Sequence, residues 1–266
     1  MPNSDRLGIL FIGDIVGKPG RTILKTLLPK LISRYEAQLV IANGENAAGG
    51  FGINEKVAKE LFSFGVDIIT TGNHVWDKKE AVEFIAKEPR ILRPLNYPEG
   101  VPGTGSILFK SRENQLVGVI NVAGRVFMSP LDCPFRTTKK EIERLREKTK
   151  IIVIDFHAEA TSEKQAFAFY FDGKVSAIIG THTHVQTADE RVLPKGTAYI
   201  TDAGMTGPEN SVIGFREKEI IEKFLTQMPQ KYDVPSASSI LSGVYVEIDT
   251  NSGLANRIER IMIKEN

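Results

Sequence analysis

The sequence is poor in the residues that would indicate a disulfide framework or a binder of long polyanions. Its single cysteine, Cys133, excludes an intrachain disulfide and any site built from several thiolates. We expect Cys133 to be a small buried residue in a reducing compartment. The 34 basic residues balance 33 acidic ones to a net charge of +1, so nothing favours DNA as a partner and any recognition of phosphate must be local.

Long apolar runs are also missing from the sequence. No stretch approaches the roughly 20 apolar residues of a membrane-spanning helix. The first apolar run, at 7–12, is too short for the core of a signal sequence. We therefore expect a cytoplasmic protein without a membrane partner. Because no linker, repeat or low-complexity tract interrupts the chain, we expect residues 1–266 to form one domain.

The order of apolar and amphipathic segments predicts an α/β fold. Near the N-terminus, expected strands at 7–13, 38–43 and 67–71 alternate with expected helices at 21–35, 54–65 and 78–89. Such alternation is typical of a parallel sheet. Further strands are expected at 106–110, 115–124, 151–156, 176–180 and 197–202, and further helices at 137–150, 163–171 and 216–228. The alternating segments 243–249 and 255–263 predict an antiparallel hairpin.

Polar side chains follow several of these apolar runs. The runs ILFIGD, LVIANGEN, IITTGNH, IIVIDFH and AIIGTHTH end in Asp14, Glu45, Asn46, Asn73, His74, His157, His182 and His184, which include all four histidines of the chain. Ligands collect beyond the carboxyl ends of strands in open α/β sheets, so we expect one convergent cluster. Carboxylate, amide and imidazole groups without a thiolate suit a hydrolytic centre with two metal ions.

Such a centre would meet both demands of phosphate ester hydrolysis. Two ions roughly 3.5–4 Å apart acidify a water molecule and offset the charge of the ester. They need a shared anionic ligand, for which Glu45 is suited, while the other polar residues of the cluster complete the two coordination shells. This ligand set accepts iron, manganese or zinc.

At this point the motifs resemble those of calcineurin-like metallophosphoesterases. The matching elements are Gly13-Asp14, Gly72-Asn73-His74, the lone His157 and Gly180-Thr181-His182-Thr183-His184. Two departures are Asp14-Ile15-Val16, which lacks the usual histidine, and Gly44-Glu45-Asn46, which replaces the usual Gly-Asp. Together with GDIVGKPGR, NGENAAGG and the PFR at 134–136, these departures resemble the YmdB-like branch. The resemblance runs from about residue 8 to the C-terminus.

The resemblance implies a fold, an activity and a role for each residue of the cluster. The fold would be a four-layer α/β/β/α sandwich of two mixed sheets. The activity would be hydrolysis of 2′,3′-cyclic nucleotides by a metal-bridging hydroxide at a di-iron centre. One metal would be held by Asp14, Glu45, Asn46 and His184. The other would be held by Glu45, Asn73, His157 and His182. His74 would act on the substrate.

Other interpretations stay open for several residues. Asp14 could cap a helix, and Asn46 could be a turn residue. Lys18 and Arg21 could bind phosphate near a helix N-terminus or form an ordinary basic turn. Arg136 could contact substrate or be exposed, and Asp202 could support a ligand histidine. Trp76 is expected to pack rather than stack on a base.

Other functions are also compatible with the cluster. One is a phosphomonoesterase with the same centre. Another is a regulatory protein that binds a nucleotide or an RNA end with little turnover. We expect a small phosphodiester as the partner, with RNA ends as a further class, and assembly into a homo-oligomer is allowed.

Overall fold

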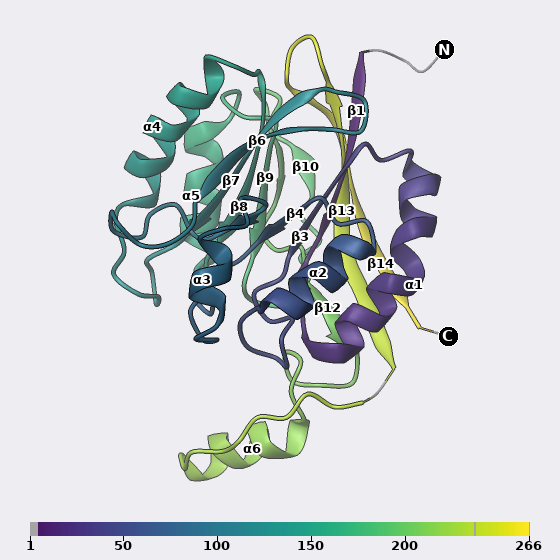
Figure 1. Ribbon diagram of the computed structural model, residues 1–266, viewed down its shortest axis with the longest axis vertical. Helices are drawn as coiled ribbons and strands as arrows, with labels where there is room; N and C mark the ends of the chain where they lie inside the picture. Colours follow the sequence, from purple (N-terminus) through teal and green to yellow (C-terminus); the bar gives the residue numbers. More distant parts are fainter. Residues whose placement is uncertain (1–4, 237, 266) are drawn as a thin grey trace.

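Two β-sheets lie face to face at the centre of the computed structural model, and helices cover their outer faces (Figure 1). The structure describes residues 5–236 and 238–265. Each sheet combines parallel and antiparallel strand pairs. The predicted four-layer sandwich of two mixed sheets is therefore confirmed.

The first sheet has eight strands. They are β1 (Arg6–Ile12), β2 (Asp14–Ile15), β3 (Leu39–Asn43), β4 (Ile68–Thr70), β5 (Ile91–Leu92), β12 (Met205–Pro208), β13 (Ser239–Asp249) and β14 (Ala255–Lys264). Their order is β2-β12-β13-β1-β3-β4-β5, with β14 paired to β13. The neighbours β1, β3, β4 and β5 run parallel, so their carboxyl ends lie at one edge of the sheet.

The second sheet has six strands. They are β6 (Ser106–Lys110), β7 (Leu116–Ala123), β8 (Ile151–His157), β9 (Ala177–Thr181), β10 (Arg191–Val192) and β11 (Ala198–Ile200). The order is β10-β11-β9-β8-β7-β6, and the four central strands are parallel. The carboxyl ends of β8 and β9 therefore lie next to each other.

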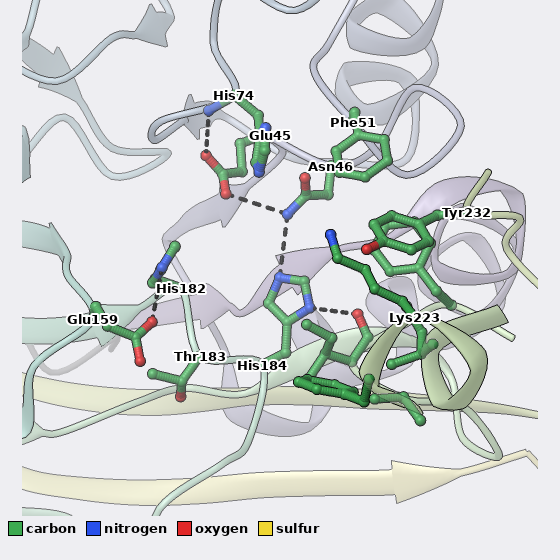
Figure 2. A pocket seen from close by; sticks show the side chains of 15 residues that line it. Glu45, Asn46, Phe51, His74, Glu159, His182, Thr183, His184, Lys223 and Tyr232 are labelled. Carbon is green, nitrogen blue, oxygen red and sulfur yellow. Dashed lines mark hydrogen bonds and ion pairs between the residues drawn. The ribbon is translucent and has the colours of Figure 1, made fainter. Parts of the chain in front are cut away.

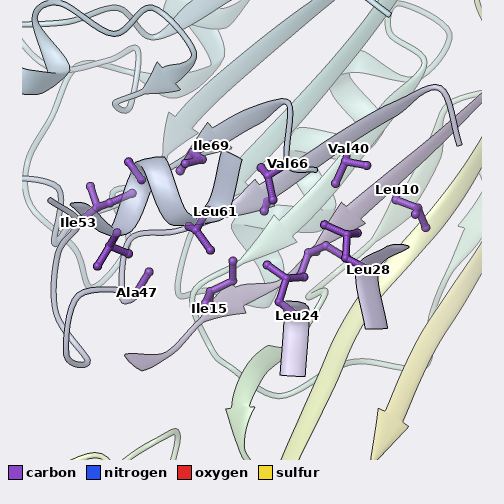
Figure 3. Close-up of a cluster of buried hydrophobic side chains, with 14 of the residues drawn as sticks. Leu10, Ile15, Leu24, Leu28, Val40, Ala47, Ile53, Leu61, Val66 and Ile69 are labelled. Atoms are coloured by element: carbon purple, nitrogen blue, oxygen red, sulfur yellow. The ribbon is translucent and has the colours of Figure 1, made fainter. Parts of the chain in front are cut away.

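Alternating apolar residues hold the layers together because successive strand residues point to opposite faces. In β1, Ile9 and Phe11 belong to the core between the sheets, whereas Leu10 and Ile12 face the helices outside. Those helices are α1 (Gly17–Tyr35), α2 (Glu55–Ser63) and α3 (Ala81–Ile85). Figure 3 shows side chains of α1 packed with those of the first sheet.

The second sheet is covered in the same way. Helices α4 (Pro134–Arg146) and α5 (Thr161–Phe171) bury their apolar faces on it, with Phe167 stacked on Phe156 at 4.1 Å between ring centres. The last helix, α6 (Glu217–Thr226), differs because it extends from the body of the molecule (Figure 1). Along the described chain no helix has the length and apolar character needed to cross a membrane.

The structure corrects several sequence predictions. The short strands β2, β5, β10 and β12 were not predicted, because two to four residues carry too little hydrophobic pattern. The helix expected at 78–89 is only Ala81–Ile85, and Pro89 disfavours helical backbone at the residue before it. Cys133 is only partly buried, since it precedes the first turn of α4. Trp76 packs against the core and against Tyr97, as expected.

Candidate metal centre

The polar residues predicted to converge lie at the facing edges of the two sheets. Asp14, Glu45 and Asn73 follow the parallel strands β1, β3 and β4, and His157 ends β8 of the opposite sheet. The sheets meet here directly, with His157 Nε2 at 3.1 Å from Glu45 Oε1. The structure thus brings together residues from distant parts of the chain.

One group of potential ligands surrounds His157. The ligand atoms of Glu45, His157 and His182 all lie within 4.8 Å of one another. His182 Nδ1 and Asn73 Oδ1 each lie 3.0 Å from His157 Nε2. Four ligand atoms therefore point at a common volume, which is the arrangement that a cation requires.

A second group lies on the other side of Glu45. His184 Nε2 is 3.2 Å from Asn46 Nδ2 and 3.8 Å from Asp14 Oδ1, and the Asn46 amide also contacts Glu45 at 3.2 Å. Rotating the Asn46 amide by half a turn would present its oxygen to the same point. Asp14 is fully buried, and its Oδ1 has no hydrogen-bond partner in the described chain. A bound cation would satisfy this costly buried oxygen.

The three clustered histidines are oriented as metal ligands are. One ring nitrogen of His157, of His182 and of His184 faces the cluster, and the other faces an oxygen outside it. Those outer acceptors are the Thr181 hydroxyl at 2.9 Å, the Glu159 carboxylate at 3.0 Å and the Ile213 carbonyl at 2.9 Å. Because the outer nitrogen donates its hydrogen to the acceptor, the inner nitrogen of the neutral imidazole would have a lone pair for a metal ion.

The electrostatics of the cluster also favour a cation. Burial raises the pKa of Asp14. Burial alone would raise the pKa of Glu45 too, but His157 and the other histidines outweigh it and lower that pKa to about 2. In turn, Glu45 and Asp14 overcome the effect of burial on His157 and raise its pKa to about 9. A proton on His157 therefore meets the demand for positive charge that a metal ion would meet.

The loop that carries His182 and His184 has an unusual backbone. Their φ values of 104° and 67° lie in the left-handed region, which costs non-glycine residues free energy. A buried ion pair supports this loop: Lys164 Nζ donates to Asp202 Oδ2 and to the Thr181 carbonyl, each at 2.8 Å. Asp202 also accepts from the Thr183 backbone N–H at 3.1 Å. Asp202 thus contacts the backbone between the two histidines rather than an imidazole.

A second buried carboxylate lies beneath the cluster. Asp155 accepts hydrogen bonds from Asn43 at 3.0 Å, Thr181 at 2.6 Å and Thr70 at 2.5 Å. Burial, only partly offset by His157 and these hydroxyls, raises the pKa of Asp155 to about 6. Thr181 in turn contacts His157, so Asp155 fixes the orientation of that imidazole through one intermediate.

The cluster opens into a cavity of about 560 Å³. His74, Glu45, Asn46, His182 and His184 line one side of it, and Figure 2 shows their side chains around the opening. His74 differs from the other three histidines because its Nδ1 lies 2.8 Å from Asp77, on the rim. Its backbone N–H donates to Glu45 Oε2 at 3.3 Å.

The three basic residues considered as phosphate contacts are placed elsewhere. Arg21 pairs with Glu60 at 2.8 Å and donates to the Ala47 carbonyl at 2.6 Å, so it braces the loop after β3. Lys18 lines a separate cavity, and Arg136 is exposed on α4. The described lining of the metal-site cavity includes none of them. Asp14 is not a helix cap either, since α1 begins at Gly17 after Val16.

Four supporting residues were not predicted from the sequence: Asp77, Asp155, Glu159 and Lys164. Asp155 had a signal, because a charged residue inside the apolar run IIVIDFH has to be buried with partners. Lys164 had none, since a lysine in a surface helix is ordinarily solvated.

Gly72 offers a test of the shared volume between Glu45 and His157. A Cβ on Gly72 would lie 2.2 Å from Glu45 Oε2 and 2.3 Å from His157 Nε2. Gly72 lacks a positive φ, so alanine fits the backbone and only space is lost. We expect Gly72→Ala to lower metal content measured by elemental analysis. Gly118→Ala is the control and should keep its metal, because its Cβ would meet Leu145 Cδ1 at 3.1 Å, Ile152 Cγ1 at 3.4 Å and the Ile151 carbonyl at 3.7 Å, and none of these belongs to the cluster. Full metal content in Gly72→Ala would contradict this prediction.

The Lys164–Asp202 pair gives a prediction about stability. Lys164→Met leaves the Asp202 carboxylate buried without a cation, which should lower the free energy of unfolding by about 3–5 kcal/mol. Denaturant unfolding of the metal-free protein measures the loss. Lys164→Met combined with Asp202→Asn should recover part of it, because the second change removes the unpaired charge. A single variant as stable as the parent would show that the pair does not hold the loop.

The chain is 51% identical over 257 residues to the 2′,3′-cyclic-nucleotide 2′-phosphodiesterase of Bacillus subtilis (strain 168), covering 97% of both. A crystal structure described as a novel phosphatase from Mycoplasma pneumoniae superposes with a TM-score of 0.93 at 38% identity, over 98% of this chain and 95% of that one. A hypothetical protein from Thermus thermophilus gives 0.90 at 41% identity, over 98% and 100%. The family model described as YmdB-like protein matches residues 10–261, and the chain belongs to that family.

Proposed function

We propose that the protein is a metal-dependent phosphodiesterase that hydrolyses 2′,3′-cyclic nucleotides at a centre of two metal ions. The observation that carries this proposal is the orientation of three imidazoles around two buried carboxylates. The inner nitrogens of His157 and His184 face Glu45 and Asp14, and the Nδ1 of His182 faces His157 Nε2 in the same group of ligand atoms. The name of the Bacillus subtilis relative supports the substrate class.

We assign the two groups of ligand atoms to two metal positions. One ion would be held by Asp14, Glu45, Asn46 and His184. The other would be held by Glu45, Asn73, His157 and His182. Iron is the favoured metal, with manganese or zinc as alternatives. Such ions supply charge neutralisation for the phosphoryl oxygens and a lowered pKa for a water molecule.

We assign His74 the transfer of a proton to the leaving oxygen of the substrate. The Asp77 carboxylate can only accept, so the Nδ1 of His74 carries the hydrogen and the Nε2 is left for the cavity. When protonated, Nε2 can donate to the leaving oxygen. The bond from the His74 backbone N–H to Glu45 keeps the imidazole next to the cluster.

In the proposed reaction, water opens the cyclic phosphodiester of a 2′,3′-cyclic nucleotide. The oxygen of a water molecule forms a bond to phosphorus, and the P–O2′ bond breaks. O2′ takes the proton from Nε2 of His74. The attacking water releases a proton to solvent, from which His74 is protonated again. The product is a nucleoside 3′-phosphate, in agreement with the 2′-phosphodiesterase named for the relative.

A phosphomonoesterase with the same centre is the second candidate, because the Mycoplasma pneumoniae structure is described as a phosphatase. The two activities separate on paired substrates. A diesterase converts 2′,3′-cyclic AMP to 3′-AMP and stops, whereas a monoesterase releases inorganic phosphate from 3′-AMP.

Metal removal tests the proposal as a whole. We expect close to two ions per chain in protein purified without added metal, and we expect a chelator to abolish opening of 2′,3′-cyclic AMP. The far-UV circular dichroism should change little, because extensive apolar cores hold the sheets together without metal. Full turnover by a metal-free preparation would refute the proposal.

Replacing His74 separates proton transfer from metal binding. His74→Ala should keep both ions, since Nε2 faces the cavity and Nδ1 faces Asp77. Turnover of 2′,3′-cyclic AMP should fall roughly 10²–10⁴-fold, as expected for the loss of a general acid. The fall should be smaller for a nitrophenyl diester, whose leaving group needs no proton. His157→Ala is the comparison and should lose metal; the same loss in His74→Ala would make His74 a ligand.

A further inference from the structure

The cavity has a second wall that the proposed chemistry does not use, and this wall is aromatic. Phe51 and Phe215 stack at 4.9 Å between ring centres with an interplanar angle of 22°. Tyr232 lies 5.4 Å from Phe215 and 6.5 Å from Phe51. Figure 2 shows Phe51 and Tyr232 on the opposite side of the opening from His182 and Glu159.

Two distant segments build this aromatic wall. Phe51 belongs to the glycine-rich loop after β3, where Gly50 has a φ of 100°. A Cβ on Gly50 would lie 2.9 Å from the Phe215 ring, so glycine permits the close approach of the two segments. Phe215 and Tyr232 flank α6, the helix that extends from the body, and they contact each other across its ends.

The wall adjoins the reacting end of the cavity. The Phe51 ring meets the His74 imidazole edge to face at 5.1 Å. Phe215 is buried, and Phe51 and Tyr232 are partly exposed to the cavity that they line. A ligand with one end beside His74 would therefore extend along these rings.

Two polar groups at this wall, the Tyr232 hydroxyl and the Lys223 ammonium group, have no hydrogen-bond or ion-pair partner among the described residues. The Tyr232 hydroxyl makes no hydrogen bond to any residue that the structure describes. Lys223 lies with its Nζ 5.3 Å from the centre of the Tyr232 ring and has no ion pair within the described chain. Among the described residues that line the cavity, it is the one lysine or arginine.

We infer that this aromatic wall binds the nucleobase of the substrate, with Tyr232 as its exposed stacking surface. The inference rests on the proposed function, because it assigns the phosphate to the metal centre and the base to the opposite wall. A cavity of about 560 Å³ has the volume of an ordinary small-ligand site. Stacking uses the face that every base has, so the wall should favour nucleotides over base-free phosphates and discriminate little among bases.

Binding measurements test the wall without relying on turnover. We expect the manganese-loaded parent protein to bind 3′-AMP more tightly than inorganic phosphate in calorimetry. Tyr232→Leu should weaken 3′-AMP binding roughly 5- to 150-fold, the usual effect of losing one stacked ring, and leave phosphate binding unchanged. Tyr232→Phe keeps the ring and should retain most of the affinity.

A control variant separates the loss of stacking from structural damage to α6 and the segments that flank it. Leu225 lies on α6 close to Lys223, is 79% exposed and does not line the cavity. Leu225→Ala should therefore bind 3′-AMP and phosphate as the parent does. Metal content should be equal in all four proteins.

Turnover provides the second measurement. Tyr232→Leu should raise the KM for 2′,3′-cyclic AMP with little change in kcat, and it should not change kcat/KM for glycerol 1,2-cyclic phosphate, which has no base. Equal losses on both substrates, or no loss on either, would overturn the inference. So would a parent protein that binds 3′-AMP no more tightly than phosphate. If the parent opens no cyclic phosphate but Tyr232→Leu still loses its preference for 3′-AMP over inorganic phosphate, the proposed function is refuted. The inference that the aromatic wall binds the base is then still supported.

Discussion

One buried carboxylate joins the two sheets by directed hydrogen bonds. Asp155 of the second sheet accepts hydrogen bonds from Asn43 and Thr70 of the first and from Thr181 of its own. Apolar contacts between the sheets have no direction and would tolerate sliding. A buried carboxylate, in contrast, is costly unless its partners stay in place. This constraint acts beneath the point where Glu45 and His157 meet, and through Thr181 it fixes the His157 imidazole relative to the first sheet.

The sequence was sufficient to predict the cluster because the cluster follows from strand ends. Apolar runs that end in Asp14, Glu45 and Asn73 predict parallel strands, and these share one edge of the first sheet, whereas His157 reaches the cluster from the second sheet. Their convergence needs no knowledge of loop geometry. The packing of both sheets was predicted only through the family resemblance, since hydrophobic periodicity does not reveal which sheet faces which.

The supporting residues could not be predicted, because tertiary contacts decide their roles. Lys164 lies in a helical segment that the sequence leaves free to face solvent, yet it is 1% exposed and holds the loop of His182. Arg21 lies near a helix N-terminus, as a phosphate contact would, but Glu60 and the Ala47 carbonyl already use its guanidinium. In both cases the sequence shows the charge of the side chain but not its partner. The acidic partner lies 38 residues away from Lys164 and 39 residues away from Arg21.

The two walls of the cavity meet different physical demands, and the fold builds them differently. Metal ligands have to be held to within roughly 0.5 Å, and residues that follow buried strands and rest on buried hydrogen bonds provide this precision. Stacking on a base, as inferred for the aromatic wall, tolerates larger displacements, so segments that flank a helix extending from the body can provide part of it. On the proposed function, substitutions in α6 and the segments that flank it would alter which phosphodiester fits without moving Glu45 or His157, because among the described residues the rings of the aromatic wall do not contact the hydrogen-bonded network around Asp155.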